Sequence, residues 1–382
     1  MNKFIRISGK IILIFLICLT LDVIFMRLLP IDIKTKIYDK RSHKIKSYYY
    51  HHDLRPNSHW IENWGWQTSK IYTNNLGFKD KEIRNVKFKK NNILFIGDSF
   101  TEGLGVEYEN SFVGIIENKI TSEFDNFTVL NAGLSSYSPI IYLSKLNYLI
   151  KKKIPITKVF VVICGGDFYD DIFRYDSIDN EYVVNHGDFV KVKILININN
   201  FIKSNTLIYQ FIKQVTPISN LVSRFKNKKE TNDTNNYTKE QVLEILNSKP
   251  DWKHIHDKDA FNNWAIKGLK KSTIYMDKIN ELLKSNNIDF TLIYLDGAMS
   301  MLNNETSNAK YYENHWQEFS KKNSIDFIFL DDYHENYNDK FSIYKKLFFI
   351  GDNHFNNKGN QIVAEEIINK SKYFKNLLNF AD

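Results

Sequence analysis

Short apolar runs alternate with helical segments from Asn92 onward, and this alternation limits the folds open to the chain. The runs have the length and composition of buried strands and comprise Ile93–Ile96, Thr128–Leu130, Val159–Cys164, Phe290–Leu295 and Phe327–Leu330. The same part of the sequence predicts helices over Ser111–Ile120, Ile140–Ile150 and Gln361–Leu378. Strands that alternate with helices are typical of a parallel sheet covered by helices. We therefore expect an α/β fold, a three-layer α/β/α sandwich with a mostly parallel sheet.

The N-terminus carries a basic flank followed by an apolar run, Ile11–Leu21. Counted through Asp22, the segment Ile11–Leu29 is about long enough to cross a bilayer. No small-x-small cleavage site follows it, so we interpret residues 1–30 as an uncleaved signal anchor. A cleaved signal peptide is the second interpretation and a buried core helix the third. The basic flank favours a cytoplasmic N-terminus, with the rest of the chain in the periplasm or at the cell surface.

Two regions follow the predicted anchor. Residues 31–90 are polar and aromatic without a sustained helical period, and we expect an extended N-terminal extension wrapped on the catalytic domain there. Residues 91–382 carry the strand–helix alternation, which breaks down over about 175–257. We interpret that stretch as an insertion, either a lid or docking surface or a decoration without a function of its own.

The composition argues against several classes of protein. The formal net charge is +8, but the lysines are scattered and no arginine-rich helix occurs, so we expect no nucleic-acid partner. The two cysteines, Cys18 and Cys164, predict neither a disulfide scaffold nor a cysteine-rich metal site. The adjacent His51 and His52 would point to opposite faces of a strand and make a poor metal pair. We therefore expect no metal and no organic cofactor.

A serine and an acid–histidine pair, far apart in the sequence, form the candidate site. Ser99 directly follows the predicted strand Ile93–Ile96, and active sites of open α/β sheets gather at such strand ends. Asp352 and His354 lie in a polar loop before the last predicted helix. A histidine can accept the serine proton, and a carboxylate on its other nitrogen fixes its tautomer. These residues predict a nucleophile, a base and an orienting acid.

The motifs resemble those of the SGNH (GDSL-like) hydrolase and acyltransferase superfamily, whose fold is a flavodoxin-like sandwich. Gly-Asp-Ser-Phe at 97–100 resembles the family's nucleophile block, which implies that Ser99 is the nucleophile. Asn-Ala-Gly at 131–133 resembles its second block, which implies that the N–H of Gly133 joins that of Ser99 in an oxyanion hole. The resemblance extends over about Ile93 to Asn369.

The sequence departs from the family pattern at two places. The resemblance implies His354 as base and Asp352 as acid, but their spacing is Asp-x-His rather than Asp-x-x-His, so Asp331 or Asp332 could replace Asp352. In the third block, Gly166 stands where the family has an asparagine that donates to the oxyanion. Loss of one such donor costs about 10²–10³ in turnover. Gly166 therefore either leaves room for another donor or a bulky acyl group, or marks a slow or degenerate site.

The resemblance implies a serine esterase for acyl esters, with cell-envelope glycans as the first candidate substrates and lipid esters as the next. One alternative is an O-acyltransferase that passes the acyl group to a surface polysaccharide. Another is a catalytically degenerate protein that binds or assembles glycans. Membrane-anchored relatives have stretches similar to His52–Asn57 and Thr73–Asp80 before the serine block. The sequence assigns neither the acyl group nor an oligomeric state.

Overall fold

The structure is a computed structural model of the chain, and it describes residues 2–29, 43–175, 194, 195, 198, 200–202, 205–209, 237–303, 308–330 and 339–379. The chain divides into two compact units. The first consists of Met1–Arg55 and Gly187–Asn232, and the second of Pro56–His186 and Asp233–Asp382. The second unit carries the sheet and all residues of the candidate site that the structure describes.

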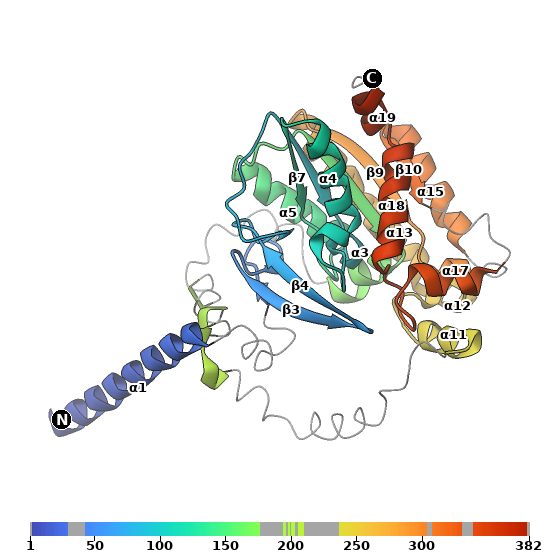
Figure 1. The fold of residues 1–382 in the computed structure, drawn as a ribbon. Helices are drawn as coiled ribbons and strands as arrows, with labels where there is room; N and C mark the ends of the chain where they lie inside the picture. Colours follow the sequence, from blue (N-terminus) through green and yellow to red (C-terminus); the bar gives the residue numbers. More distant parts are fainter. Residues whose placement is uncertain are drawn as a thin grey trace. The chain divides into compact units, whose positions relative to one another are not determined.

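The second unit is built on an eight-stranded sheet with the order β10-β9-β8-β6-β7-β5-β4-β3 (Figure 1). Its parallel part comprises β10 (Asp326–Leu330), β9 (Asp289–Leu295), β8 (Lys158–Cys164), β6 (Asn91–Ile96) and β7 (Phe127–Asn131). Each of these strands contains one of the predicted apolar runs. Strands of a parallel sheet are buried on both faces, which explains why the runs are apolar without alternation. The prediction of a mostly parallel sheet is confirmed.

Three antiparallel strands extend the sheet beyond β7: β5 (Lys79–Asp80), β4 (Gln67–Thr73) and β3 (His59–Trp64). These residues belong to the region 31–90 that the sequence analysis places in an extension before residue 91. In the structure β5 pairs with β7, so these strands join the sheet and cover an edge that would otherwise expose unpaired backbone groups. Trp60 and Ile71 lie opposite each other on β3 and β4, and both are buried.

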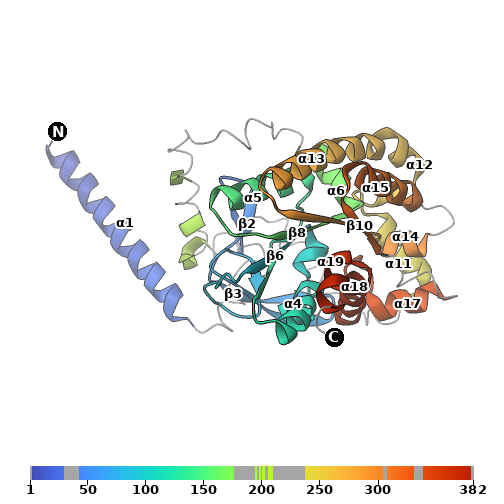
Figure 2. The same cartoon turned by 90° about the horizontal axis from the view of Figure 1, so that it is seen from above.

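Helices cover both faces of the sheet. α5 (Pro139–Lys151) and α13 (Ile266–Ser285) pack together on one face, and α4 (Phe112–Glu123) and α18 (Asn357–Lys370) pack together on the other (Figure 2). The stacked rings of Phe95 and Phe160, with centroids 4.7 Å apart, continue to Phe374 at 5.1 Å from Phe160. The three-layer sandwich predicted from the sequence is therefore present.

The closing helix expected over Gln361–Leu378 is two helices, α18 and α19 (Lys372–Asn379), which meet at Ser371. Ser371 has the extended angles φ −66° and ψ 124°, so the first helix ends there. Its hydroxyl oxygen accepts the backbone N–H of Phe374 at 3.4 Å, as serine does at a helix N-terminus. The helical period of apolar residues continues across Ser371, so the sequence alone predicts one helix.

Much of the predicted insertion over 175–257 lies outside the described residues. Its described C-terminal part includes the helix α11 (Lys239–Asn247). At the N-terminus of this helix, Thr238 and Gln241 form a capping box. Residues 233–257 belong to the second unit and residues 187–232 to the first, so the stretch is not a single structural element.

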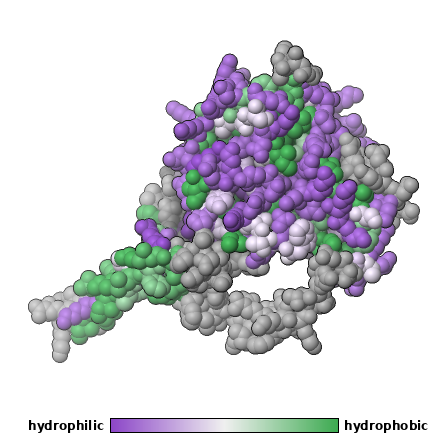
Figure 3. Space-filling model, viewed as in Figure 1, coloured by the Kyte–Doolittle hydropathy of each residue, from purple (hydrophilic) through white to green (hydrophobic). Residues whose placement is uncertain are grey.

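The first unit contains α1 (Asn2–Leu28), and its segment Ile7–Leu28 is long and apolar enough to cross a membrane, with a mean hydropathy of 2.6. The surface of this helix is apolar along most of its length (Figure 3). The carboxylate of Asp22 accepts the backbone N–H groups of Leu207 at 3.1 Å and Ile208 at 3.3 Å. These bonds satisfy the charged group that interrupts the apolar run.

Replacing Ser111 with alanine is expected to lower the free energy of unfolding by about 1–2 kcal/mol, because it removes the N-cap of α4. The fully buried Ser111 hydroxyl accepts the N–H of Gly114 at 3.2 Å and donates to the carbonyl of Tyr108 at 2.6 Å. Urea unfolding of the full-length chain in detergent, followed by tryptophan fluorescence, measures the change. The exposed Ser122 of the same helix is the matched control, and Ser122→Ala should stay within about 0.5 kcal/mol of wild type. Equal stability of the two variants would contradict the capping role.

Candidate active site

Ser99 lies at the carboxyl end of β6, where the chain turns into the short helix α3 (Ser99–Glu102). The side chain of Asp98 caps this helix by accepting a backbone N–H of its first turn at 2.9 Å. A Cβ atom on Gly97 would lie 2.9 Å from the backbone oxygen of Val162, closer than side chains approach backbone. Only glycine fits there, so the tight turn places Ser99 at the strand end as the sequence predicts.

A line of hydrogen bonds joins the three residues that the sequence analysis singles out. The Oγ atom of Ser99 lies 2.8 Å from Nε2 of His354. The Nδ1 atom of His354 lies 2.6 Å from Oδ1 of Asp352. Since Nδ1 donates to the carboxylate, Nε2 is left as the acceptor for the serine proton. The fold therefore brings a serine, a histidine and a carboxylate from distant parts of the chain into one line of hydrogen bonds.

The short Asp-x-His spacing works because Asp352 organises its own loop. Its Oδ1 atom also accepts the backbone N–H groups of Asn353 at 2.6 Å and His354 at 3.1 Å. These bonds fold the loop back so that the imidazole reaches the same carboxylate. Asp331 and Asp332, the alternative acids, lie outside the described residues.

Two aromatic side chains flank the imidazole of His354. The ring of Phe100 lies 5.1 Å away between centroids, and that of Trp64 lies 5.5 Å away in an edge-on orientation. Trp64 is the last residue of β3, so a strand from the region 31–90 reaches the site. The sequence analysis noted no role for Trp64, and its only signal was the tryptophan-rich composition of that region.

The acid and the base shift each other's ionisation. Burial alone would raise the pKa of Asp352, but the adjacent imidazole and its hydrogen bond hold that pKa well below the usual range. Burial opposes protonation of His354, yet the carboxylate of Asp352 prevails and raises the pKa of the imidazole above its ordinary value. The carboxylate thus stabilises the imidazolium that forms when His354 accepts a proton.

The structure does not favour Gly133 as an oxyanion donor. Gly133 is buried, and its N–H donates to Oδ1 of Asn131 at 3.0 Å. Ser136, three residues on, lines the cavity at Ser99 and has a left-handed φ of 66°. Among the described residues, neither the N–H of Ser136 nor that of Ser99 has an acceptor. Among the described residues that line the cavity, Ser99 and Ser136 thus carry backbone N–H groups without an acceptor, and the sequence analysis did not single out Ser136.

Gly166 lies at the carboxyl end of β8 and lines the same cavity. A Cβ atom here would lie 3.4 Å from the indole of Trp252, so the indole covers the place of the missing asparagine side chain. The neighbouring Gly165 lies under His254, whose Nε2 donates to the Gly165 carbonyl at 3.0 Å. Trp252 and His254 fall within the predicted insertion, and nothing in the sequence pattern connected them to this turn.

The cavity at Ser99 has a volume of about 180 Å³ and a wall rich in ionisable side chains. The ionisable residues that line it are Asp98, Asp167, Asp170, Arg174, Lys249, Asp251 and His354. Arg174 donates to the hydroxyl of Ser136 at 2.7 Å and pairs with Asp170 at 2.9 Å. Lys249 lies 3.6 Å from Asp352. The cavity therefore suits a small ligand with polar groups at its rim.

Three potential metal ligands, Asp98, Cys164 and Asp167, lie beneath the site with their ligand atoms within 4.8 Å of one another. The Cys164 thiol lies 3.1 Å from Asp98 Oδ2, and the Tyr142 hydroxyl donates to Asp167 at 2.9 Å. Burial raises the pKa of each of the three groups, which favours the protonated forms. The three groups are thus joined to one another and to Tyr142 by hydrogen bonds beneath the site.

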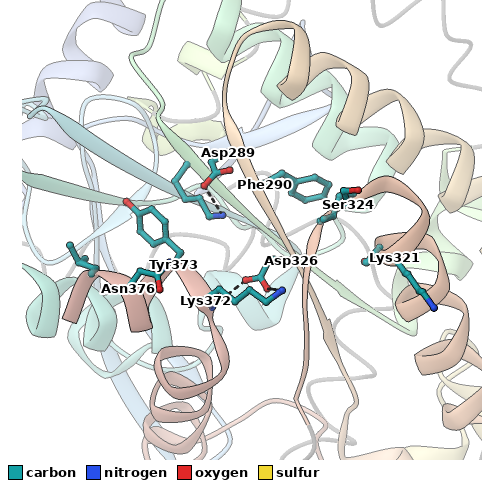
Figure 4. Close-up of a pocket in the computed structure, with 12 residues that line it drawn as sticks. Asp289, Phe290, Lys321, Ser324, Asp326, Lys372, Tyr373 and Asn376 are labelled. Carbon is teal, nitrogen blue, oxygen red and sulfur yellow. Dashed lines mark hydrogen bonds and ion pairs between the residues drawn. The ribbon is translucent and has the colours of Figure 1, made fainter. Parts of the chain in front are cut away.

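A second and larger cavity, of about 720 Å³, lies at the opposite end of the parallel strands (Figure 4). Lys158, Asp289 and Asp326 begin β8, β9 and β10 and line this cavity. Lys158 lies 3.4 Å from Asp289, and Lys372 lies 3.8 Å from Asp326. The residues that line it, all within the described part of the chain, include no histidine. Its described lining therefore offers no serine–histidine pair like Ser99 and His354.

No family model matches the sequence, and no curated protein matches it. The chain is similar to the solved structure of the psychrotrophic esterase EstA from Pseudoalteromonas sp., with 13% identity, a TM-score of 0.39, and coverage of 76% of this chain and 100% of that chain. For Axe2, an acetylxylan esterase from Geobacillus stearothermophilus, the identity is 11% and the TM-score 0.36, over 74% of this chain and 94% of that chain. For a member of the lipolytic protein G-D-S-L family from Veillonella parvula, the identity is 12% and the TM-score 0.33, over 73% and 96%. Because these identities and TM-scores are low, we infer the function from the geometry of the site itself.

Replacing Asp352 with asparagine is expected to lower the pKa of His354, because the carboxylate that stabilises the imidazolium is removed while burial remains. NMR titration of the full-length chain with ¹³C-labelled histidine measures this pKa in both proteins. His254 is an internal reference, since burial lowers its pKa to about 3 and its signal should not move between pH 5 and 9. An unchanged or higher pKa of His354 in the variant would contradict the coupling.

Proposed function

We propose that this chain is a serine esterase of the SGNH type, with Ser99 as nucleophile, His354 as base and Asp352 as orienting acid. The line of hydrogen bonds from Ser99 through His354 to Asp352 carries the proposal. A nucleophile and base within hydrogen-bond reach, with the base held by a third group, is the arrangement that activates a serine hydroxyl.

In the proposed reaction, Oγ of Ser99 attacks the ester carbonyl carbon while its proton passes to Nε2 of His354. The imidazolium then returns the proton to the leaving alcohol, and the acyl group stays on Ser99. A water molecule, deprotonated by His354, attacks this acyl-enzyme and releases the acid and the free serine. Asp352 stabilises the imidazolium in both halves of the reaction. The backbone N–H groups of Ser99 and Ser136 are the proposed donors to the oxyanion in each tetrahedral intermediate.

The cavity supports a short acyl group on a polar alcohol. Its volume of about 180 Å³ is below the roughly 300–1,000 Å³ of drug-sized ligand pockets, which leaves little room for a long acyl chain. Charged side chains such as Arg174, Lys249 and Asp251 line it, and they suit the hydroxyl groups of a sugar better than a lipid. We therefore propose acyl esters of cell-envelope glycans as the substrate class.

The apolar segment Ile7–Leu28 supports anchoring in a membrane, with the esterase unit outside the cytoplasm. Transfer of the acyl group to a sugar hydroxyl would use the same acyl-enzyme. The insertion that would exclude water for such transfer lies largely outside the described residues, so hydrolysis is the proposed reaction. The 2.8 Å contact between Ser99 and His354 argues against a degenerate site.

Replacing Ser99 with alanine is expected to abolish labelling by a fluorophosphonate and to lower hydrolysis of p-nitrophenyl acetate by about 10⁴-fold or more, because no nucleophile remains. His354→Ala should lose activity to a similar extent. Both assays use the full-length chain in detergent. Ser285→Ala, at an exposed position on α13, is the control and should behave as wild type. A folded wild-type protein that neither labels nor hydrolyses the ester would overturn the proposed function.

Lengthening the acyl chain from acetyl to octanoyl should lower kcat/KM for the p-nitrophenyl ester by about tenfold or more, because the longer chain exceeds the cavity. Steady-state kinetics on the two esters below their critical micelle concentrations measures the ratio. Equal or higher kcat/KM with octanoate would contradict the assignment of a short acyl group.

A further inference from the structure

The structure offers a side-chain donor in place of the asparagine that Gly166 lacks. A Cβ atom on Gly166 would lie 3.4 Å from both Nε1 and Cζ2 of Trp252 and 3.5 Å from Cε2. The nitrogen-bearing edge of the indole therefore faces the space into which an asparagine side chain would extend. Glycine at position 166 is what allows the indole to lie there.

The indole N–H of Trp252 is available to a ligand. Indole is a donor only, and a buried donor without a partner costs about 1–3 kcal/mol. Among the described residues, Nε1 of Trp252 has no acceptor, although the residue is only 6% exposed. Nε1 of Trp316 is fully buried without a hydrogen-bond partner, whereas Nε1 of Trp252 is not fully buried. Trp252 also lines the cavity at Ser99. Its N–H is therefore accessible, and it belongs to a side chain that lines the cavity at Ser99.

The segment that carries Trp252 is tied to the turn that carries Gly166. His254 donates from Nε2 to the carbonyl of Gly165 at 3.0 Å, and its Nδ1 lies 2.7 Å from the hydroxyl of Tyr312. Burial lowers the pKa of His254 to about 3, so the imidazole is neutral and its tautomer is set by these two bonds. His254 is therefore a positioning residue, which holds the segment with Trp252 against the turn with Gly166.

We propose that the Nε1–H of Trp252 is the side-chain donor of the oxyanion hole, alongside the backbone N–H groups of Ser99 and Ser136. The inference rests on the proposed esterase function and deepens it. During attack by Ser99, negative charge develops on the carbonyl oxygen of the ester, and the indole N–H donates to that oxygen. No bond to Trp252 forms or breaks. Glycine replaces the asparagine at position 166, and the side-chain donor to the oxyanion comes from Trp252 instead.

The test is Trp252→Phe in the full-length protein, because phenylalanine keeps an aromatic ring but lacks Nε1 and Cζ2. We expect kcat for p-nitrophenyl acetate to fall by about 10²-fold while KM changes by less than about threefold. Trp264→Phe is the matched control: its ring lies 5.0 Å from that of His254, yet it does not line the cavity, and its kcat should stay within about threefold of wild type.

Rescue separates the donor role from packing. Adding Gly166→Asn to Trp252→Phe restores an amide donor in the vacated space and should recover at least about tenfold in kcat. In the wild-type protein, reaction with a fluorophosphonate should move the indole N–H resonance of Trp252 downfield, because the phosphonyl oxygen occupies the oxyanion position. Unchanged kcat in Trp252→Phe, or a loss without rescue and without a resonance shift, would overturn the inference. The proposed esterase would survive that result, since its own test is Ser99-dependent labelling and turnover.

Discussion

The parallel pairing of β6 with β7 on one side and β8 on the other is the constraint on which the candidate site depends. Phe95 of β6 lies opposite Asn131 of β7 and Phe160 of β8. Since the three strands run in the same direction, the loops that follow them meet at one edge of the sheet. Those loops carry Ser99, Ser136 and Gly166, which is why these three residues line one cavity.

His354 reaches this edge through a contact between helices. Asp352 and His354 precede α18, which packs against α4, the helix that follows the nucleophile loop. The side chain of Asn360 in α18 accepts the backbone N–H of Phe112 at the start of α4, at 3.1 Å. That bond ties the two helix starts together, so the loop with His354 is held beside Ser99. Within the loop, the bonds to Asp352 Oδ1 set the orientation of the imidazole.

Two tryptophans complete the site from parts of the chain outside the strand–helix alternation. Trp64 comes from the antiparallel strands that extend the sheet, and its ring flanks His354. Trp252 comes from the segment after α11, and its ring covers Gly166. Both regions looked accessory in the sequence because neither has a sustained helical or strand period. Their contribution depends on contacts with residues far away in the chain, which local periodicity does not encode.

The sequence by itself predicted the parallel strands, the main helices, and Ser99, Asp352 and His354 as candidate site residues. Apolar runs and helical periods are local consequences of burial, and a serine at a strand end is readable from its neighbours. Only the tertiary structure decided that the N–H of Gly133 is already bonded to Asn131, that Ser136 lines the cavity, and that an indole lies over Gly166. Whether a donor is free depends on which acceptor the folded chain places beside it. That choice is made by packing between distant segments, which composition and spacing along the chain do not specify.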